Sequence, residues 1–373
     1  MNRSTAATLA AIILLGLTLR VLQLDFQPLW WDEGYSVFFA TRDFGALLAR
    51  TAVDIHPPLY YALMQGWTRA LGKDALVLRG LSVIIGVAAI PLLYLVAKRL
   101  FDRRTARVAA FLLAISPLHV FYSQELRMYG MVTLLALASV ALQLKILTAE
   151  LEIRDSKLEI GNSNLQPPTS NLQPPVLLYI LCTTALLYTQ YLAAFIIAAQ
   201  VVVILFLHFR QSPLNLRQWV TRWLAVGVLY LPWVLYAGPK LYAYVTAKVG
   251  IEQYSRLDPL TYLAQHLAAF SVGHISEWTW LAWGALVFVG LAIFGFVASL
   301  QSQDAIRDTR YAIGYPLSAI RYRLSAIGSP LTAIYLFVPL LLGFLVNLVY
   351  PFHPLRYERL LLFAAPFFLI LVA

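Results

Sequence analysis

The residues best suited to chemistry in this chain are charged side chains at the borders of long apolar runs. Asp32 and Glu33 lie in WWDEGYS, Glu125 and Arg127 lie in SQELRMY, and Arg356 lies in HPLRYER. Charged residues beside a membrane helix are costly and usually have a partner or a function. A carboxylate can take the proton of an attacking hydroxyl, and arginines can bind a phosphate and stabilise it as a leaving group. The mixture indicates acid–base chemistry on a hydroxyl next to a phosphate.

The carboxylates and their neighbours also have purely structural interpretations. Asp32 or Glu33 could cap the helix that follows in the loop. Glu125 and Arg127 could pair with each other or mark a solvated turn. His56, in DIHPPLYY, could simply precede a Pro-Pro pair that sets a rigid start to a helix. The sequence alone leaves these alternatives open.

Two further groups could act only at the lipid interface. Arg356 and Arg359 could be side chains that reach from a span into water. Trp30 and Trp31 could stack on a sugar, although anchoring at the interface is the commoner use of such residues. What favours function for all these residues together is their position in loops on the same side of the membrane.

The composition determines which elements must position these residues. Of 373 residues, 60% are hydrophobic and only 12% are charged, whereas soluble domains carry about 25% charged residues. The chain is therefore a multi-pass membrane protein. Its net charge of +10 lies mostly in short loops between apolar runs, where it orients the chain. Because no basic arm or aromatic–basic platform is present in the sequence, nucleic acid is not expected as a partner.

The apolar runs predict ten membrane spans. The stretch 176–208 is too long for one crossing, and Thr189-Gln190-Tyr191 near its middle predicts a hairpin of two short spans. The first run follows Arg3 and lacks a small-residue cleavage site, so we expect it to be retained. The runs fall near 7–24, 76–97, 107–122, 128–147, 176–208, 219–238, 279–300, 331–350 and 360–373.

Counting loops by parity places the charged motifs on one face. With a cytoplasmic N-terminus, 16 Lys and Arg residues lie in inside segments and 11 lie in the longer outside segments. This bias has the sign of the positive-inside rule. We therefore expect a single transmembrane domain, 1–373, with a first catalytic outer loop at 25–75 and another outer loop at 239–278.

Two stretches expected on the cytoplasmic side are interpreted as insertions, and the last apolar run is interpreted as truncated. The insertions cover 150–175, which contains a repeated SNLQPP, and 301–330, where AIGYPLSAI is followed by the related AIGSPLTAI. The final apolar run, 360–373, is short for a crossing and has no polar cap. We expect the chain to continue beyond it.

The order of the motifs resembles the GT-C membrane glycosyltransferases. The similarity is to the bacterial branch related to protein O-mannosyltransferases and aminoarabinose transferases, which is glycosyltransferase family 39-like. It rests on WWDEGYS through HPPLYY, RGLSVIIGVAAIPLLYLVAKRLF, SPLHVFYSQELRMYG and RYERLLLFAAPFF. The resemblance implies an all-α helix bundle with juxtamembrane loop helices on the outer face. It also implies a polyprenyl-phosphate sugar donor and transfer with inversion.

The resemblance also implies roles for individual carboxylates. Asp32 matches the family's first-loop aspartate, the base for the acceptor hydroxyl, and Glu33 completes the Asp-Glu pair and positions Asp32. Glu125 matches the acidic position of the second loop. These three residues form the expected catalytic set.

The expected donor-phosphate set is basic and aromatic. Arg127 accompanies Glu125, Arg356 and Tyr357 match a late Arg-Tyr motif, and His56 aligns with the residue before the family's Pro-Pro pair. In the aminoarabinose transferases Glu-Lys stands there and contacts metal and phosphate, whereas this chain has Ile55-His56. Isoleucine cannot supply a carboxylate, so no metal site of that kind and no cofactor are predicted, and His56 could still contact phosphate.

The predicted function is transfer of a monosaccharide from a polyprenyl-phosphate donor to an acceptor hydroxyl on a protein, lipid or glycan. The expected location is the bacterial cytoplasmic membrane, with the site facing the periplasm or exterior. One alternative is a flippase or transporter of lipid-linked sugars that uses the same charges for recognition only; transporters more often place charges at the midplane of broken helices. A non-catalytic membrane assembly subunit is the other alternative.

Overall fold

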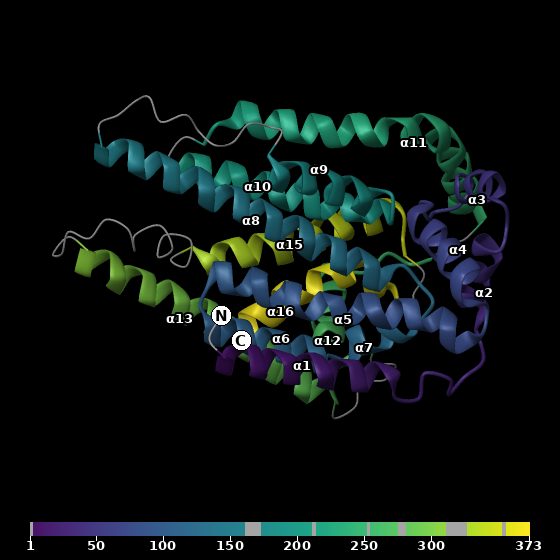
Figure 1. Cartoon of the computed structure of the whole chain (residues 1–373), viewed down its shortest axis with the longest axis horizontal. Coiled ribbons are helices and arrows are strands. Elements are labelled where there is room, and N and C mark those ends of the chain that lie inside the picture. The colour runs from purple at the N-terminus through teal and green to yellow at the C-terminus, as the bar shows by residue number, and fades with distance from the viewer. Residues whose placement is uncertain are drawn as a thin grey trace.

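The computed structural model describes residues 3–160, 173–210, 214–251, 254–274, 281–310, 327–352 and 356–373. In this part of the chain the regular structure is helical, and long helices lie side by side in a bundle with short helices gathered at one end (Figure 1). The short helices are α2 (Trp31–Ala40), α3 (Phe44–Thr51) and α4 (Leu59–Leu71). The bundle and its connections comprise α1 (Arg3–Val21), α5 (Ala75–Leu100), α6 (Arg103–Ile115), α7 (Pro117–Gln124), α8 (Tyr129–Ile160), α9 (Pro174–Leu187), η1 (Tyr191–Ala193), α10 (Ala194–Arg210), α11 (Leu216–Ile251), α12 (Pro259–Val272), α13 (Leu281–Arg310), α15 (Gly328–Val349), η2 (Tyr357–Ala364) and α16 (Ala365–Val372).

The multi-pass membrane architecture is confirmed. Seven described helices are long and apolar enough to cross a bilayer, and the bent pair α6–α7 would make an eighth. The other two expected spans are helical but short, because α9 has 14 residues and the last run is divided between η2 and α16. The number of full-length spans is therefore below the ten expected. Much of both expected insertions, at 150–175 and 301–330, lies outside the described residues.

A buried arginine stabilises the break between α6 and α7, which are bent by 53°. Pro117 cannot donate a backbone hydrogen bond, so carbonyls at the end of α6 lack helical partners. Arg20, fully buried at the end of α1, donates to the carbonyls of Ala114 at 2.9 Å and Leu113 at 3.1 Å, and to that of Gly16 in its own helix at 2.8 Å. The break directs α7 and the loop after it towards α2.

The hairpin expected in 176–208 is confirmed, and its turn joins the bundle to the short helices. The chain leaves α9 at Tyr188, whose carbonyl accepts a hydrogen bond from the Leu59 amide at 2.9 Å. Two residues later, the side-chain amide of Gln190 donates to the carbonyl of Leu360 in η2 at 3.2 Å. The turn therefore holds the start of α4 close to η2.

Polar side chains connect the long helices inside the bundle. Gln143 of α8 accepts a hydrogen bond from Tyr335 of α15 at 2.6 Å and donates to the carbonyl of Gln200 in α10 at 3.0 Å. The side chain of Gln200 in turn donates to Ser139 at 2.8 Å and accepts from Tyr179 at 2.9 Å. Because buried polar groups are costly without partners, this network fixes how the helices pack.

The helices α2, α3 and α4 form a cap over one end of the bundle (Figure 1). Their apolar faces meet at Phe39 and Tyr61, whose rings lie 4.9 Å apart, and the side-chain amide of Gln65 donates to the carbonyl of Arg42 at 2.5 Å. This arrangement agrees with the loop helices expected in 25–75. The expected loop 239–278 behaves differently, because α11 continues unbroken to Ile251 and α12 packs against α13, α7 and η2.

Candidate active site

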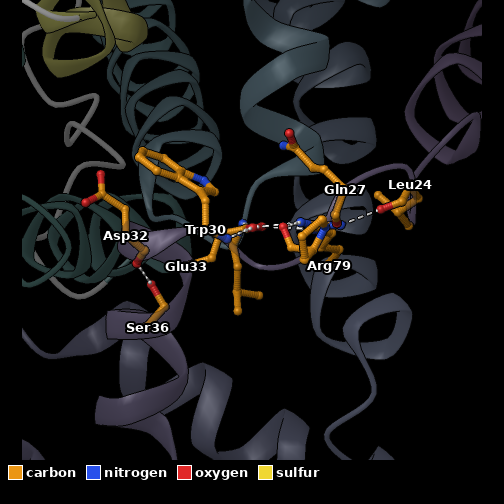
Figure 2. A network of polar contacts seen from close by, with 9 residues as sticks. Leu24, Gln27, Trp30, Asp32, Glu33, Ser36 and Arg79 are labelled. Carbon is orange, nitrogen blue, oxygen red and sulfur yellow. Dashed lines mark hydrogen bonds and ion pairs between the residues drawn. The ribbon is translucent and has the colours of Figure 1, made fainter.

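Glu33 and Arg79 form a buried ion pair in which both carboxylate oxygens accept hydrogen bonds. Glu33 is completely buried in the first turn of α2, and Arg79, 3% exposed, comes from the first turns of α5. The guanidinium donates to both carboxylate oxygens, from Nε at 2.9 Å and from Nη2 at 2.7 Å, as Figure 2 shows. The backbone amides of Trp30 and Leu126 also donate to Glu33, at 3.3 and 3.1 Å. Glu33 thus fastens α2 to α5 and to the loop before α8.

Asp32 points in another direction from its neighbour. Successive side chains on a helix diverge by about 100°, so a fixed Glu33 turns Asp32 away from Arg79 (Figure 2). Its carboxylate is 22% exposed and lies 3.2 Å from the guanidinium of Arg359 in η2. The described structure thus gives Asp32 a partially accessible carboxylate in a fixed orientation.

Arg127 brings the backbone of α2 and the loop before α4 together. This buried guanidinium, 4% exposed, donates to the carbonyl of Asp32 at 3.1 Å and to Nε2 of His56 at 3.2 Å. Because an arginine only donates, Nε2 of His56 must accept, which places the imidazole proton on Nδ1. Nδ1 of His56 then donates to Asp54 at 3.3 Å. Asp32, His56 and Arg127, predicted from three separate motifs, do come together.

The pKa values of Asp54 and His56, two residues apart in one short loop, are both lowered. Burial lowers the pKa of His56, and Arg127 lowers it further against the raising effect of Asp54. Burial alone would raise the pKa of Asp54, but hydrogen bonds from His56 and from the Ile55 amide at 2.7 Å lower it overall. The pair therefore consists of a neutral imidazole and an ionised carboxylate near neutral pH.

Glu125 lies behind this cluster, in the loop between α7 and α8. It is 3% exposed, and its Oε2 has no hydrogen-bond partner in the described structure. Burial and then the charge of Glu33 raise the pKa of Glu125 to about 7, against the lowering effect of Arg359, Arg127 and Arg356. At neutral pH Glu125 is therefore half-protonated and can both donate and accept a hydrogen bond.

The raised pKa of Glu125 should make the protein less stable as the pH rises from about 5 to about 7. The folded state binds the Glu125 proton more tightly than an unfolded chain, whose carboxyl has a pKa near 4.5, so ionisation favours unfolding. The difference corresponds to about 3 kcal/mol once the pH exceeds 7. Glu125→Gln should flatten this dependence, measured as the midpoint of thermal unfolding in detergent from pH 5 to 8. An equally steep dependence in the variant would assign it to another group.

The two members of the late Arg-Tyr motif are not brought to the cluster around Asp32. Tyr357 is buried, its hydroxyl donates to Gln265 of α12, and its ring stacks on that of Tyr262. Arg356 has the left-handed backbone angle φ of 57° and places its guanidinium 5.0 Å from the ring centroid of Phe121. The residue of this motif that meets Asp32 is Arg359.

A second ion pair secures the segment that carries Arg359. Glu358 lies 3.3 Å from Nδ1 of His274, whose Nε2 lies 2.5 Å from the hydroxyl of Tyr122 on α7. His274 can reach Tyr122 because Gly273 has a φ of 90° and because a side chain at Gly273 would crowd Pro117. These contacts hold η2 against α7 and so set the position of Arg359.

A pocket of about 420 Å³ opens beside Asp32 under the cap. Its walls come from α2, the end of α3, the loop before α4, Arg127 and the far end of α11. The lining residues are Trp31, Asp32, Tyr35, Phe38, Phe39, Arg50, Val53, Asp54, Ile55, His56, Arg127 and Tyr244. Two carboxylates, a neutral imidazole and two guanidiniums therefore face one space that a small substrate group can fill.

Four residues of this region have no predicted role in the sequence. An arginine inside an apolar span is itself a signal, and Arg79 could have been found by that criterion. Arg359 lies three residues after Arg356 in HPLRYER, and Asp54 lies two residues before His56 in DIHPPLYY, so both belong to motifs that the sequence points to. Arg50 carries no local signal, because only the tertiary fold brings α3 to the pocket.

Metal-binding side chains do not gather in this region. In the described ranges, no three His, Cys, Asp or Glu side chains lie close enough together to hold an ion. Asp54 and His56 are the nearest approach to such a group, and they are hydrogen-bonded to each other.

Comparison with known proteins supports a glycosyltransferase fold. Residues 55–155 match the family model described as dolichyl-phosphate-mannose-protein mannosyltransferase. The structure is similar to the archaeal oligosaccharyltransferase AglB from Archaeoglobus fulgidus, solved with an inhibitory peptide and a dolichol-phosphate. The TM-score is 0.56 with 14% identity over 99% of this chain and 50% of that one. A second structure of the Archaeoglobus fulgidus oligosaccharyltransferase, with zinc and sulfate, has a TM-score of 0.49 and 15% identity over 96% of this chain and 53% of that one.

The chain thus spans about half the length of the solved structures that it resembles. No curated protein matches it in sequence. The structure thus has a fold similar to that of this oligosaccharyltransferase, and residues 55–155 are similar to the mannosyltransferase family. The expectation drawn from the motifs is confirmed at this level.

Proposed function

We propose that the protein transfers a monosaccharide from a polyprenyl-phosphate donor to an acceptor hydroxyl, with Asp32 as the base. The observation that carries this proposal is the position of Asp32, whose carboxylate lines the 420 Å³ pocket between a guanidinium and an imidazole. Glu33 acts through its pair with Arg79 and positions Asp32 without meeting the substrate. We place the protein in the bacterial cytoplasmic membrane, with this pocket on the periplasmic or outer side.

The reaction is a single displacement at the anomeric carbon. Asp32 accepts the proton of the acceptor hydroxyl as its oxygen forms a bond to that carbon. The bond between the carbon and the phosphate oxygen breaks, and its electrons leave with the polyprenyl phosphate. Arg127 stabilises the departing charge, with His56 as its neighbour in the same wall. Attack opposite to the leaving group inverts the anomeric configuration.

Arg359 gives Asp32 a partner before the donor binds. The guanidinium of Arg359, 3.2 Å away, occupies the carboxylate that would otherwise meet the acceptor hydroxyl. A donor phosphate would compete for the same guanidinium, because arginine binds phosphate and carboxylate through the same donors. Asp32 then becomes free to act as base once the donor is in place.

The proposed function is tested with the purified chain in lipid nanodiscs and defined polyprenyl-phosphate sugars. We expect release of polyprenyl phosphate that depends on the chain, and its rate should rise when a hydroxyl acceptor is supplied. Asp74→Asn serves as a control because Asp74 is exposed and makes no capping hydrogen bond. If the protein binds the donors but releases polyprenyl phosphate from none of them, the result would contradict transfer and favour transport or an assembly role.

A further inference from the structure

Two guanidiniums line the pocket beside Asp32, and they come from different parts of the fold. Arg127 comes from the loop that leads into the long helix α8, whereas Arg50 comes from the end of α3 in the cap. Arg50 is exposed, and its guanidinium lies 5.1 Å from the ring centroid of Phe38. The other face of the arginine can therefore meet a ligand while its plane rests on an aromatic ring.

The pocket carries an excess of positive charge. Asp32 is paired with Arg359, and Asp54 accepts hydrogen bonds from His56 and the Ile55 amide. No carboxylate of the described structure lies within ion-pair distance of Arg50 or Arg127. The ionised Asp54 balances one of these two guanidiniums and the imidazole is neutral, so one positive charge remains that an anionic ligand would balance.

Exposed aromatic rings line the pocket together with Arg50. Trp31 is 75% exposed and Tyr35 is 44% exposed, and the two rings meet edge to face with centroids 5.6 Å apart. Tyr244 of α11 faces the pocket as well. Large exposed aromatic faces on a polar cavity suit the C–H face of a sugar ring, which is apolar, while its hydroxyls remain available to polar groups.

Arg127 and Arg50 lie in different parts of the fold, so we expect them to contact different groups of a ligand. A polyprenyl-linked phosphate is tethered to its lipid chain, so it must lie near the ends of the long helices, where Arg127 and Arg359 are found. Arg50 belongs instead to α3 in the cap (Figure 1) and lines the pocket from there. A group bound by Arg50 is therefore a substituent of the sugar ring and not the phosphate that links sugar to lipid.

We propose that this pocket binds an acidic sugar, with its carboxylate on Arg50 and its ring against the aromatic wall formed by Trp31 and Tyr35. Guanidinium and carboxylate match in geometry and charge, and such hydrogen bonds are about twice as strong as neutral ones. That this sugar is a unit of the donor or the acceptor rests on the proposed function. Its binding to the pocket does not.

The experiment compares three probes by saturation-transfer NMR on the purified full chain in nanodiscs. The probes are methyl glucuronide, which is acidic, methyl glucoside, which is neutral, and geranyl phosphate, a short prenyl phosphate. We expect the glucuronide to bind about tenfold more tightly than the glucoside, as a single charged hydrogen-bonded contact would give. Arg50→Gln should remove that preference and leave geranyl phosphate binding unchanged.

Arg42→Gln is the matched control. Arg42 also lies over the Phe38 ring, at 4.4 Å, but it does not line the pocket, so the glucuronide preference should persist. Equal binding of glucuronide and glucoside would overturn the proposal. So would an equal loss of geranyl phosphate binding in Arg50→Gln, because Arg50 would then belong to the phosphate site. Since turnover is not needed, selective binding without sugar transfer would refute the proposed reaction alone.

Discussion

Asp32→Asn should lower the rate of sugar transfer by about 10³-fold while the protein remains folded, as expected when a general base is lost. The amide has nearly the size of the carboxylate but cannot accept the proton of the acceptor hydroxyl. The backbone carbonyl of Asp32, which holds Arg127, is unchanged by the substitution. The kcat should therefore fall while the KM for the donor changes little. Both are measured from the rate at which polyprenyl phosphate is released.

The control for this variant is Asp74→Asn, which removes one exposed carboxylate of the same type and should retain the wild-type rate. Arg359 loses its charged partner in Asp32→Asn, but both side chains still reach water, at 21% and 22% exposure, so the unfolding temperature should fall less than in Glu33→Gln. A folded Asp32→Asn variant with the full transfer rate would refute the base assignment. Attention would then turn to Asp54, the other carboxylate that lines the pocket.

Glu33→Gln should have the largest effect on stability, lowering the free energy of unfolding by about 3–5 kcal/mol. The substitution leaves the charge of Arg79 buried beside a neutral amide, where water does not reach it to compensate for the lost ion pair. Transfer should be lost as well, because the helix that carries Asp32 is fastened through Glu33 to Arg79 and to the amide of Leu126. Unfolding by heat and by denaturant in detergent measures the change.

Arg69→Leu provides the comparison, since Arg69 is an exposed arginine of the same cap and its replacement should change stability by less than about 0.5 kcal/mol. The double variant Glu33→Gln with Arg79→Gln should be less destabilised than the sum of the two single variants, with a coupling of at least about 1 kcal/mol. Additive effects would mean that the pair contributes nothing beyond its separate contacts. Near-normal stability of Glu33→Gln would contradict its role as the fastening of α2.

Residues of three predicted motifs meet in the structure, but the contacts divide the predicted site residues into groups. Asp32, His56 and Arg127 come from three separate motifs and line one pocket. Glu33 stands next to Asp32 in the sequence and serves a different purpose, because its side chain points towards α5. In the late motif, the backbone turn at Arg356 and the packing of Tyr357 on α12 direct those two residues elsewhere and leave Arg359 facing Asp32.

By itself, the sequence determined that this chain is a membrane helix bundle, and it predicted that the motifs around Asp32, Glu125 and Arg356 lie in loops of one parity. These are properties of hydrophobicity and period, which act over about 20 neighbouring residues and can be read locally. Only the tertiary structure decided which charge meets which. The pairs Glu33–Arg79, Asp32–Arg359 and Arg127–His56 join residues far apart in the chain. Their partners depend on how whole helices pack, on the break after α6 and on a cap that carries Arg50 to the pocket, and no local pattern records those choices.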